Sequence, residues 1–304
     1  MKSSILMIAS AVLTALFSTT LRADVAVFAT VPEWGALAKE IGGDKVTVYN
    51  ATHGLQDPHR IDARPSLIAQ ARRAQLVVAT GAELEVGWLP VVLRESGNGR
   101  IQPGQPGYLE AARQVVLREV PPVLDRSHGD IHAAGNPHIQ TDPRNYLQVG
   151  EALAGRLAEI DPANQAHYRA GYSNFAGRWR SAIGRWEREA AGLRGVPVLV
   201  QHQAFPYLCD WLGLKEVGTL EPKPGVEASG SYLAEVLARQ ATLPARMVLR
   251  PAYQYDTPSR WIAERARIPA VVLPFTIGGT PEATNLVALF DDTLQRLLAA
   301  LHTP

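Results

Sequence analysis

Residues 25–49, VAVFATVPEWGALAKEIGGDKVTVY, contain the pattern that decides the fold. Two β-rich runs, Val25 to Ala29 and Lys45 to Tyr49, flank a stretch from Glu33 to Ile41 with helical spacing of its apolar residues. Alternation of strand, helix and strand predicts a parallel sheet covered by helices on both faces. The first part of the chain is therefore predicted to be an α/β unit.

The same alternation continues through the first half and begins again in the second. Its other predicted segments are Pro65 to Arg73, Leu76 to Thr80, Val196 to Val200, Phe205 to Leu212, Glu216 to Leu220, Tyr232 to Gln240, Met247 to Arg250, a helix after Thr257, Ala270 to Phe275 and a terminal helix from about Pro281 to Leu301. A shift of 171 positions lays one half on the other without a gap, placing Phe28 on Leu199 and Leu76 on Met247. Two similarly built α/β lobes are predicted.

A long helix is predicted between the two halves. Apolar residues recur there at spacings of three and four, at Tyr168, Tyr172, Phe175, Trp179, Ile183, Trp186, Ala190 and Leu193. Asp161 is the expected N-cap, Pro162 lies in the first turn, and Gly192 and Gly195 lie at the end. At about 1.5 Å per residue, a helix over residues 162–193 would be about 48 Å long. We expect lobes at residues 24–161 and 194–304, joined rigidly by this helix.

Composition describes an exported, water-soluble protein. At 304 residues and 33.0 kDa the chain exceeds the usual size of a single core, and its net charge of +1 argues against nucleic acid as a partner. Residues 1–23 are typical of a secretory signal peptide, and no later run approaches the roughly 18 apolar residues of a membrane span. Cys209 is the single cysteine, expected to be buried, and no cysteine follows the signal to carry a lipid. A free periplasmic monomer is expected.

Three histidines follow segments that should end at one edge of the sheets. His59 comes after the strand Lys45 to Tyr49, and His202 comes directly after Val196 to Val200. Ligands of open α/β sheets collect outside the carboxyl ends of the strands, so both side chains should point into one cleft. His138, held on a turn between two prolines, can complete the set. Three imidazoles suit zinc better than magnesium, calcium or manganese.

The remaining histidines are interpreted as ordinary polar residues, with one exception. His53, His167 and His302 are expected to be solvated. His128 and His132 lie near an acidic residue in a short loop before His138, where they could acquire metal transiently.

The sequence resembles a known family, the metal-binding substrate-binding proteins of bacterial zinc and manganese ABC importers, of the cluster A-I or zinc-uptake type. The resemblance covers nearly the whole chain after residue 23. It is carried by Asp57-Pro58-His59 before Arg64-Pro65-Ser66, Gly81-Ala82-Glu83-Leu84-Glu85 before Trp88-Leu89, Asn136-Pro137-His138 before Asp142-Pro143, His202 with Phe205 and Tyr207, and Glu221-Pro222 with Ser229.

The resemblance implies both a fold and a site. It implies two lobes of four-stranded parallel sheet joined by a rigid helix, with His59 and His138 as metal ligands. The third ligand of the family is His in zinc importers and Glu in many manganese importers, and here it is His202. A fourth ligand, usually Asp, follows the last strand, where this chain has Thr276. Water, Asp62 or Glu282 are the candidate replacements.

We expect a periplasmic protein that captures Zn²⁺ as transported cargo, delivers it to the membrane permease of an ABC importer, and catalyses no reaction. A periplasmic metallochaperone is a candidate loading partner. Manganese or ferrous iron as the cargo is one alternative. A zinc enzyme is the other, because three histidines with an open fourth position also describe catalytic zinc. Against it, no His-Glu-x-x-His motif is present.

Overall fold

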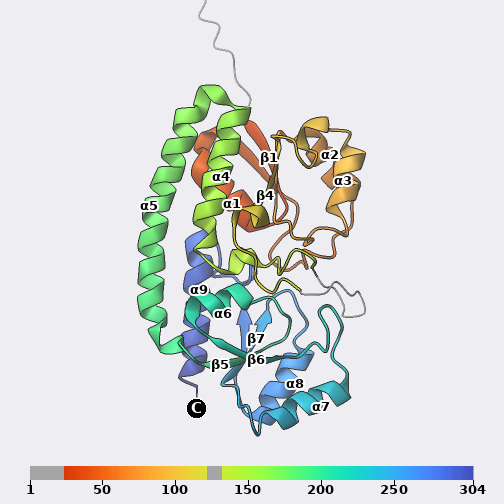
Figure 1. The fold of residues 1–304 in the computed structure, drawn as a ribbon, viewed down its shortest axis with the longest axis vertical. Coiled ribbons are helices and arrows are strands. Elements are labelled where there is room, and N and C mark those ends of the chain that lie inside the picture. The colour runs from red at the N-terminus through yellow and green to blue at the C-terminus, as the bar shows by residue number, and fades with distance from the viewer. Residues whose placement is uncertain (1–23, 122–131, 304) are drawn as a thin grey trace, which may run out of the picture.

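The computed structural model describes residues 24–121 and 132–303, so the predicted signal peptide lies outside the described residues. These residues form two lobes, each built on a four-stranded parallel sheet, with a long helix along their common side (Figure 1). The predicted fold class is confirmed. The division of the chain at residues 161 and 193 stays a prediction.

The N-terminal lobe contains the first sheet, in the order β2-β1-β3-β4. Its strands are β1 (Val25–Ala29), β2 (Val46–Asn50), β3 (Leu76–Ala79) and β4 (Tyr108–Glu110). Its helices are α1 (Pro32–Gly42), α2 (Pro65–Arg73), α3 (Leu89–Ser96) and α4 (Asn145–Ile160), with short 3₁₀ helices at Gly43–Lys45, Gly99–Ile101, Ala111–Gln114 and Ile139–Thr141. Prolines in the first turns of α1, α2 and α3 suit these starts, because the missing N–H would have no partner within the helix. Neither β4 nor α3 was predicted from the sequence, because both are too short to show a clear period.

The C-terminal lobe repeats this sheet in the order β6-β5-β7-β8. Its strands are β5 (Pro197–Val200), β6 (Lys215–Thr219), β7 (Met247–Pro251) and β8 (Ala270–Leu273), and its helices are α6 (Pro206–Leu212), α7 (Gly230–Arg239), α8 (Thr257–Ala266) and α9 (Leu286–Leu301). The last helix begins five residues later than Pro281, the predicted start. The side chain of Asn285 accepts a hydrogen bond from the backbone of Ala288, so Asn285 caps α9.

The predicted correspondence between the halves extends to strand register. Val27 pairs with Leu76 in the first sheet, and Val198 pairs with Met247 in the second. Both members of the second pair lie 171 positions after those of the first. The central strand pairs of the two lobes are therefore equivalent in register as well as in order.

The long connection consists of α5 (Gln165–Glu189) between short 3₁₀ helices at Pro162–Asn164 and Ala190–Leu193. Asp161 does not cap the backbone as predicted. Its carboxylate instead accepts hydrogen bonds from the side chains of Asn164 at 2.6 Å and Tyr168 at 2.9 Å, and the regular helix begins after that turn. None of the described helices combines the length and the apolar character needed to cross a membrane.

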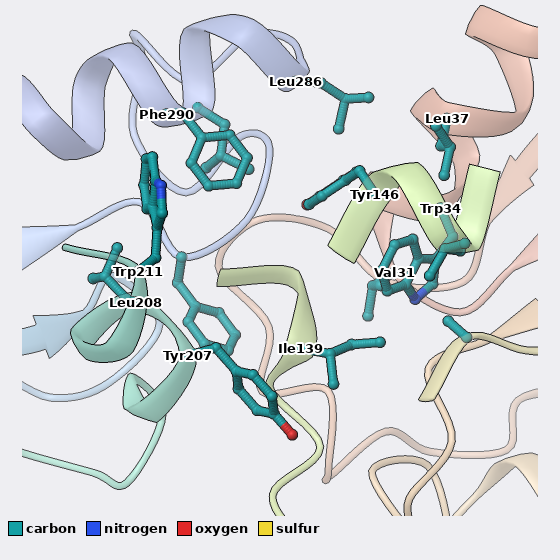
Figure 2. Packing of buried hydrophobic residues seen from close by; sticks show 14 of the residues in the cluster. Val31, Trp34, Leu37, Ile139, Tyr146, Tyr207, Leu208, Trp211, Leu286 and Phe290 are labelled. Atoms are coloured by element: carbon teal, nitrogen blue, oxygen red, sulfur yellow. The ribbon is translucent and has the colours of Figure 1, made fainter. Parts of the chain in front are cut away.

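One hydrophobic core is continuous between the lobes (Figure 2). The ring of Tyr146 from α4 lies 5.5 Å from Trp34 of α1 and 5.7 Å from Phe290 of α9, measured between centroids. Phe290 in turn lies 5.7 Å from Trp211 of α6. Moving the lobes apart would expose these rings, at about 25 cal/mol for each Å² of apolar surface. Shared packing therefore favours a fixed arrangement of the lobes.

Candidate metal centre

The three predicted histidines lie together between the lobes. His59 is in the loop between β2 and α2, His138 directly precedes the 3₁₀ helix Ile139–Thr141, and His202 follows β5. Their ring centroids are 5.2 to 5.8 Å apart, and one potential ligand atom from each lies within 4.8 Å of the other two. His138 is 1% exposed and His202 9%, whereas His59 is partly exposed. The cluster is therefore reached from the side of His59.

Two of the histidines end triplets with the same local geometry. In Asp57-Pro58-His59, the Oδ1 atom of Asp57 accepts a hydrogen bond from the His59 backbone at 3.0 Å and lies 2.8 Å from Nδ1 of its ring. In Asn136-Pro137-His138 the equivalent distances are 3.0 and 2.9 Å. Proline fixes the backbone between them and brings no N–H of its own to compete for the acceptor. Each triplet therefore orients its imidazole by itself.

His202 receives its partner from a distant segment. Its Nδ1 atom lies 2.8 Å from Oε2 of Glu221, just beyond β6, and the same oxygen accepts a hydrogen bond from the backbone of Gly225 at 2.9 Å. In the sequence, Glu221 stood out only as part of a motif with Pro222 and Ser229. No local pattern connects it with His202, so this outer partner was missed. Ser229, from the same motif, caps α7 (Gly230–Arg239).

These hydrogen bonds determine which ring nitrogen can bind a metal. The backbone N–H of His138 is always a donor, so the Asn136 atom facing it is the carbonyl oxygen, and Nδ1 of His138 carries the proton. Ionised Asp57 and Glu221 accept from their histidines in the same way. The Nε2 atoms of all three rings are buried and have no hydrogen-bond partner among the described residues. Three lone pairs therefore face one small volume.

The surroundings keep His138 neutral. Burial lowers the pKa of His138 well below its ordinary value, and the nearby rings of His59 and His202 lower it further. The ring of Phe275 covers one side of His138, with 5.6 Å between centroids, and Tyr253 packs behind Phe275 at 5.3 Å. A neutral imidazole is the form that binds metal.

The corner after β8 has different chemistry. Thr276 is 6% exposed, and its hydroxyl has no hydrogen-bond partner of ordinary geometry within the described chain. Beside it lies the carboxyl group of Glu33 from α1, which is fully buried and equally unpartnered. Burial raises the pKa of Glu33 to about 7, and the nearby Thr276 hydroxyl and Ile277 backbone offset that effect only in part. Glu33 was not among the residues predicted for the site from the sequence.

The other candidate ligands lie elsewhere. Asp62 is exposed, and Glu282 is exposed and forms an ion pair with Arg296 at 2.8 Å. Neither belongs to the cluster of potential ligand atoms. The ring of His132 lies 5.5 Å from that of His59, at the mouth of the site, whereas His128 falls outside the described residues. Transient metal acquisition by these two residues stays a prediction.

The motif at residues 81–85 organises the backbone beside the site. Glu85 is buried, and its carboxylate accepts hydrogen bonds from the Thr30 hydroxyl and from the backbone of Thr80 and Gly81. Glu83 has a left-handed backbone with φ of 67°, and its carboxylate accepts a hydrogen bond from the backbone of Ala133 at 2.7 Å. The motif thus connects the end of β3 to the chain that leads to His138.

Comparison with known proteins gives the family. A profile described as "Zinc-uptake complex component A periplasmic" matches residues 27–300. The chain belongs to this family. The chain is also similar to curated proteins at low identity. The chain is 24% identical to a high-affinity zinc uptake system protein of Bacillus subtilis over 65% of its own length and 61% of the relative's.

The same degree of identity links the chain to a manganese ABC transporter substrate-binding lipoprotein of Streptococcus gordonii, over 43% of this chain and 40% of that one. The matches thus span less than two thirds of these relatives. Solved structures agree in fold along almost their full length. A crystal structure of ZnuA has a TM-score of 0.76 at 19% identity, covering 91% of this chain and 99% of that one. A manganese-bound periplasmic metal-binding protein from Candidatus Liberibacter asiaticus has a TM-score of 0.73 at 16% identity, with the same coverage.

Proposed function

We propose that this protein captures Zn²⁺ between its lobes and delivers it to the membrane component of an ABC importer. The observation that supports zinc most directly is the convergence of three buried Nε2 atoms, from His59, His138 and His202, each on a ring whose Nδ1 is already engaged. Nitrogen donors favour zinc over manganese, which prefers carboxylate oxygen. Membership of the family supports the transport role.

The cargo is proposed to be held as a transported ion with three neutral ligands. Asp57 and Glu221 stand directly behind two of these ligands, so their negative charge would stabilise a dication without binding it. Water is proposed as the fourth ligand, since Thr276 offers only a neutral hydroxyl and neither Asp62 nor Glu282 is in the cluster. The ion would then stay accessible for transfer.

A catalytic role is not proposed. A metal-dependent hydrolase needs a general base within reach of the metal-bound water. The carboxylates beside the histidines, Asp57 and Glu221, are occupied by hydrogen bonds to the Nδ1 atoms. The signal peptide predicted at residues 1–23 and the periplasmic description of the family support export. We propose that the protein acts there as a monomer, with a metallochaperone as a candidate for loading it.

Elemental analysis of protein purified without added metal, followed by competition between zinc and manganese, tests the choice of ion. We expect one zinc per chain and a zinc affinity higher than that for manganese by orders of magnitude. Equal affinities, or manganese or iron as the native content, would overturn the zinc assignment.

Substitution of the most buried histidine tests the site. His138→Ala should weaken zinc binding by more than the roughly 100-fold that loss of an outer partner can cause, because a direct ligand is removed. His302→Ala, an exposed histidine near the C-terminus, is the matched control and should bind as the parent does. Parental zinc titration by His138→Ala would show that the ion lies elsewhere.

A further inference from the structure

The triplets that end in His59 and His138 differ in the charge of the side chain that contacts the imidazole. The first places a carboxylate, Asp57, directly on its histidine, whereas the second places a neutral amide, Asn136, on His138. This difference in charge matches how deeply the two side chains are buried. Asp57 is partly exposed, whereas Asn136 is 7% exposed and His138 only 1%. An ionised group at position 136 would be desolvated, which is unfavourable for a charge.

The amide of Asn136 is itself held by an anion. Its Nδ2 atom donates to Oε2 of Glu119 at 2.9 Å and to the backbone oxygen of Gln203 at 2.7 Å, while its Oδ1 atom faces His138. Glu119 is an exposed residue, but its carboxyl is partly desolvated where it reaches Asn136. Burial raises the pKa of this carboxyl, and the hydrogen bond from Asn136 lowers it. Glu119, Asn136 and His138 thus form a chain of hydrogen bonds that begins with a negative charge at the surface and ends on a buried imidazole.

The backbone around Glu119 is built to hold this contact. The Asn136 backbone donates to the oxygen of Arg118 at 2.8 Å, and the hydroxyl of Tyr207 accepts from the Arg118 backbone and donates to the oxygen of Asn136. Glu119 itself has a left-handed backbone with φ of 51°, which is unfavourable for a residue other than glycine, asparagine or aspartate. Glycine would relieve that strain but could not supply the carboxylate.

We infer that Glu119 is a positioning residue for the metal centre, acting through Asn136 to hold His138 in the tautomer that presents Nε2 and to supply it with negative charge. In this arrangement Asn136 and Glu119 together do for His138 what Asp57 does alone for His59. The inference rests on the proposed metal-binding function. It adds a third outer anion to Asp57 and Glu221, so that each of the three imidazoles is backed by one carboxylate.

Two substitutions separate the role of Glu119 from a general effect on folding. Glu119→Gly removes the carboxylate and relieves the backbone strain, so the melting temperature should stay the same or rise while the zinc dissociation constant increases about tenfold, the lower end for outer-shell partners. Glu119→Gln keeps an oxygen that can accept from Asn136 but removes the charge, so its loss of affinity should be intermediate. Glu159→Gln, at an exposed residue of α4 that pairs with Arg156, is the control for a simple change of surface charge.

Nuclear magnetic resonance of the metal-free protein provides a readout that does not depend on zinc. In the parent, ¹⁵N and ¹H signals of His138 should show the proton on Nδ1. In Glu119→Gly the Nδ1 proton should move upfield and the other tautomer should become detectable. If both Glu119 variants keep the parental His138 signals and zinc affinity while His138→Ala loses zinc, the inference is wrong and the proposed function stands. If the parent takes up no zinc, the proposed function fails, and the His138 signals still decide the role of Glu119.

Discussion

The N-terminal lobe contributes two imidazoles to the metal centre, His59 and His138, whereas the C-terminal lobe contributes His202 alone. The sheets of the lobes have the same order and central register, and each lobe places loops at the carboxyl ends of its strands. In the C-terminal lobe, the loop after β8 carries Thr276 where a second ligand could stand, and Glu33 of the other lobe is packed against it. Equal topology thus positions the loops of both lobes, while individual loop residues determine which lobe binds.

The largest effect on stability is expected at Glu33 of α1, which contacts Thr276 of the other lobe. Burial raises its pKa from 4.5 to about 7, so the folded protein retains a proton that the unfolded chain releases between these values. Its contribution to stability is therefore fully present below about pH 4.5, decreases as the pH rises from there toward 7, and is lost above about pH 7. The shift corresponds to about 3 kcal/mol. Glu33→Gln should be more stable than the parent at pH 8 by an amount approaching this figure, and the two should be similar at pH 4.5.

Urea unfolding of the metal-free protein across this pH range measures the effect. Glu216→Gln, in β6 of the C-terminal lobe, is the informative companion, because burial raises the pKa of Glu216 to about 7 as well, with a smaller contribution from the charge of Glu119. In each variant, the free energy of unfolding should decrease less with rising pH than it does in the parent. An unchanged pH dependence in Glu33→Gln would mean that the carboxyl at the lobe contact is not held protonated.

The outer partners allow the lobes to be compared directly. Asp57→Asn in the first lobe and Glu221→Gln in the second each replace a carboxylate on an imidazole by an amide of similar size. Both should weaken zinc binding by about 10- to 100-fold. Glu221→Gln should have the larger effect, because His202 is less exposed than His59. Water screens the interaction between Glu221 and His202 less, so losing the negative charge should weaken zinc binding more. Calorimetric titration of zinc into both variants measures the two losses of affinity. A larger loss in Asp57→Asn than in Glu221→Gln would contradict this ranking.

Thr276→Asp would give the second lobe a ligand of its own and make the two lobes equal contributors. A carboxylate in place of water should tighten zinc binding about tenfold, or about 1.4 kcal/mol, and slow its removal by a chelator. Glu33 lies against this position, so its carboxyl would stand beside the new carboxylate. The double variant Glu33→Gln/Thr276→Asp should therefore tolerate the new charge better than Thr276→Asp alone. Stopped-flow release into a chelator measures both variants. Unchanged affinity and release rate in the double variant would rule out this corner as a coordination position.

The smallest effect is expected in the arrangement of the lobes themselves. The continuous core and the stiff helix α5 should keep them almost fixed, so zinc loading should order loops more than it rotates domains. Small-angle scattering of the metal-free and zinc-loaded forms should give nearly the same radius of gyration. A lobe rotation of tens of degrees would show that the shared packing around Tyr146 and Phe290 separates.

Much of this organisation was readable in the sequence because it depends on neighbours along the chain. Periodicity in residues 25–49 determined the α/β class, and the shift of 171 positions anticipated the equivalent pairs Val27–Leu76 and Val198–Met247. The triplets ending at His59 and His138 orient their imidazoles through contacts two residues apart. The three histidines were therefore identifiable as a set before their convergence was known.

Tertiary structure alone decided the remaining features, because they join residues that no local pattern connects. Glu221 reaches His202 across 19 positions, and Glu119 reaches Asn136 across 17. The contact of Glu33 with Thr276 joins the two lobes. Candidate acids chosen for their nearness in sequence, such as Asp62 and Glu282, proved exposed and apart from the cluster. Local spacing specifies how a side chain is presented, whereas its charge environment depends on which distant segment the packed core brings beside it.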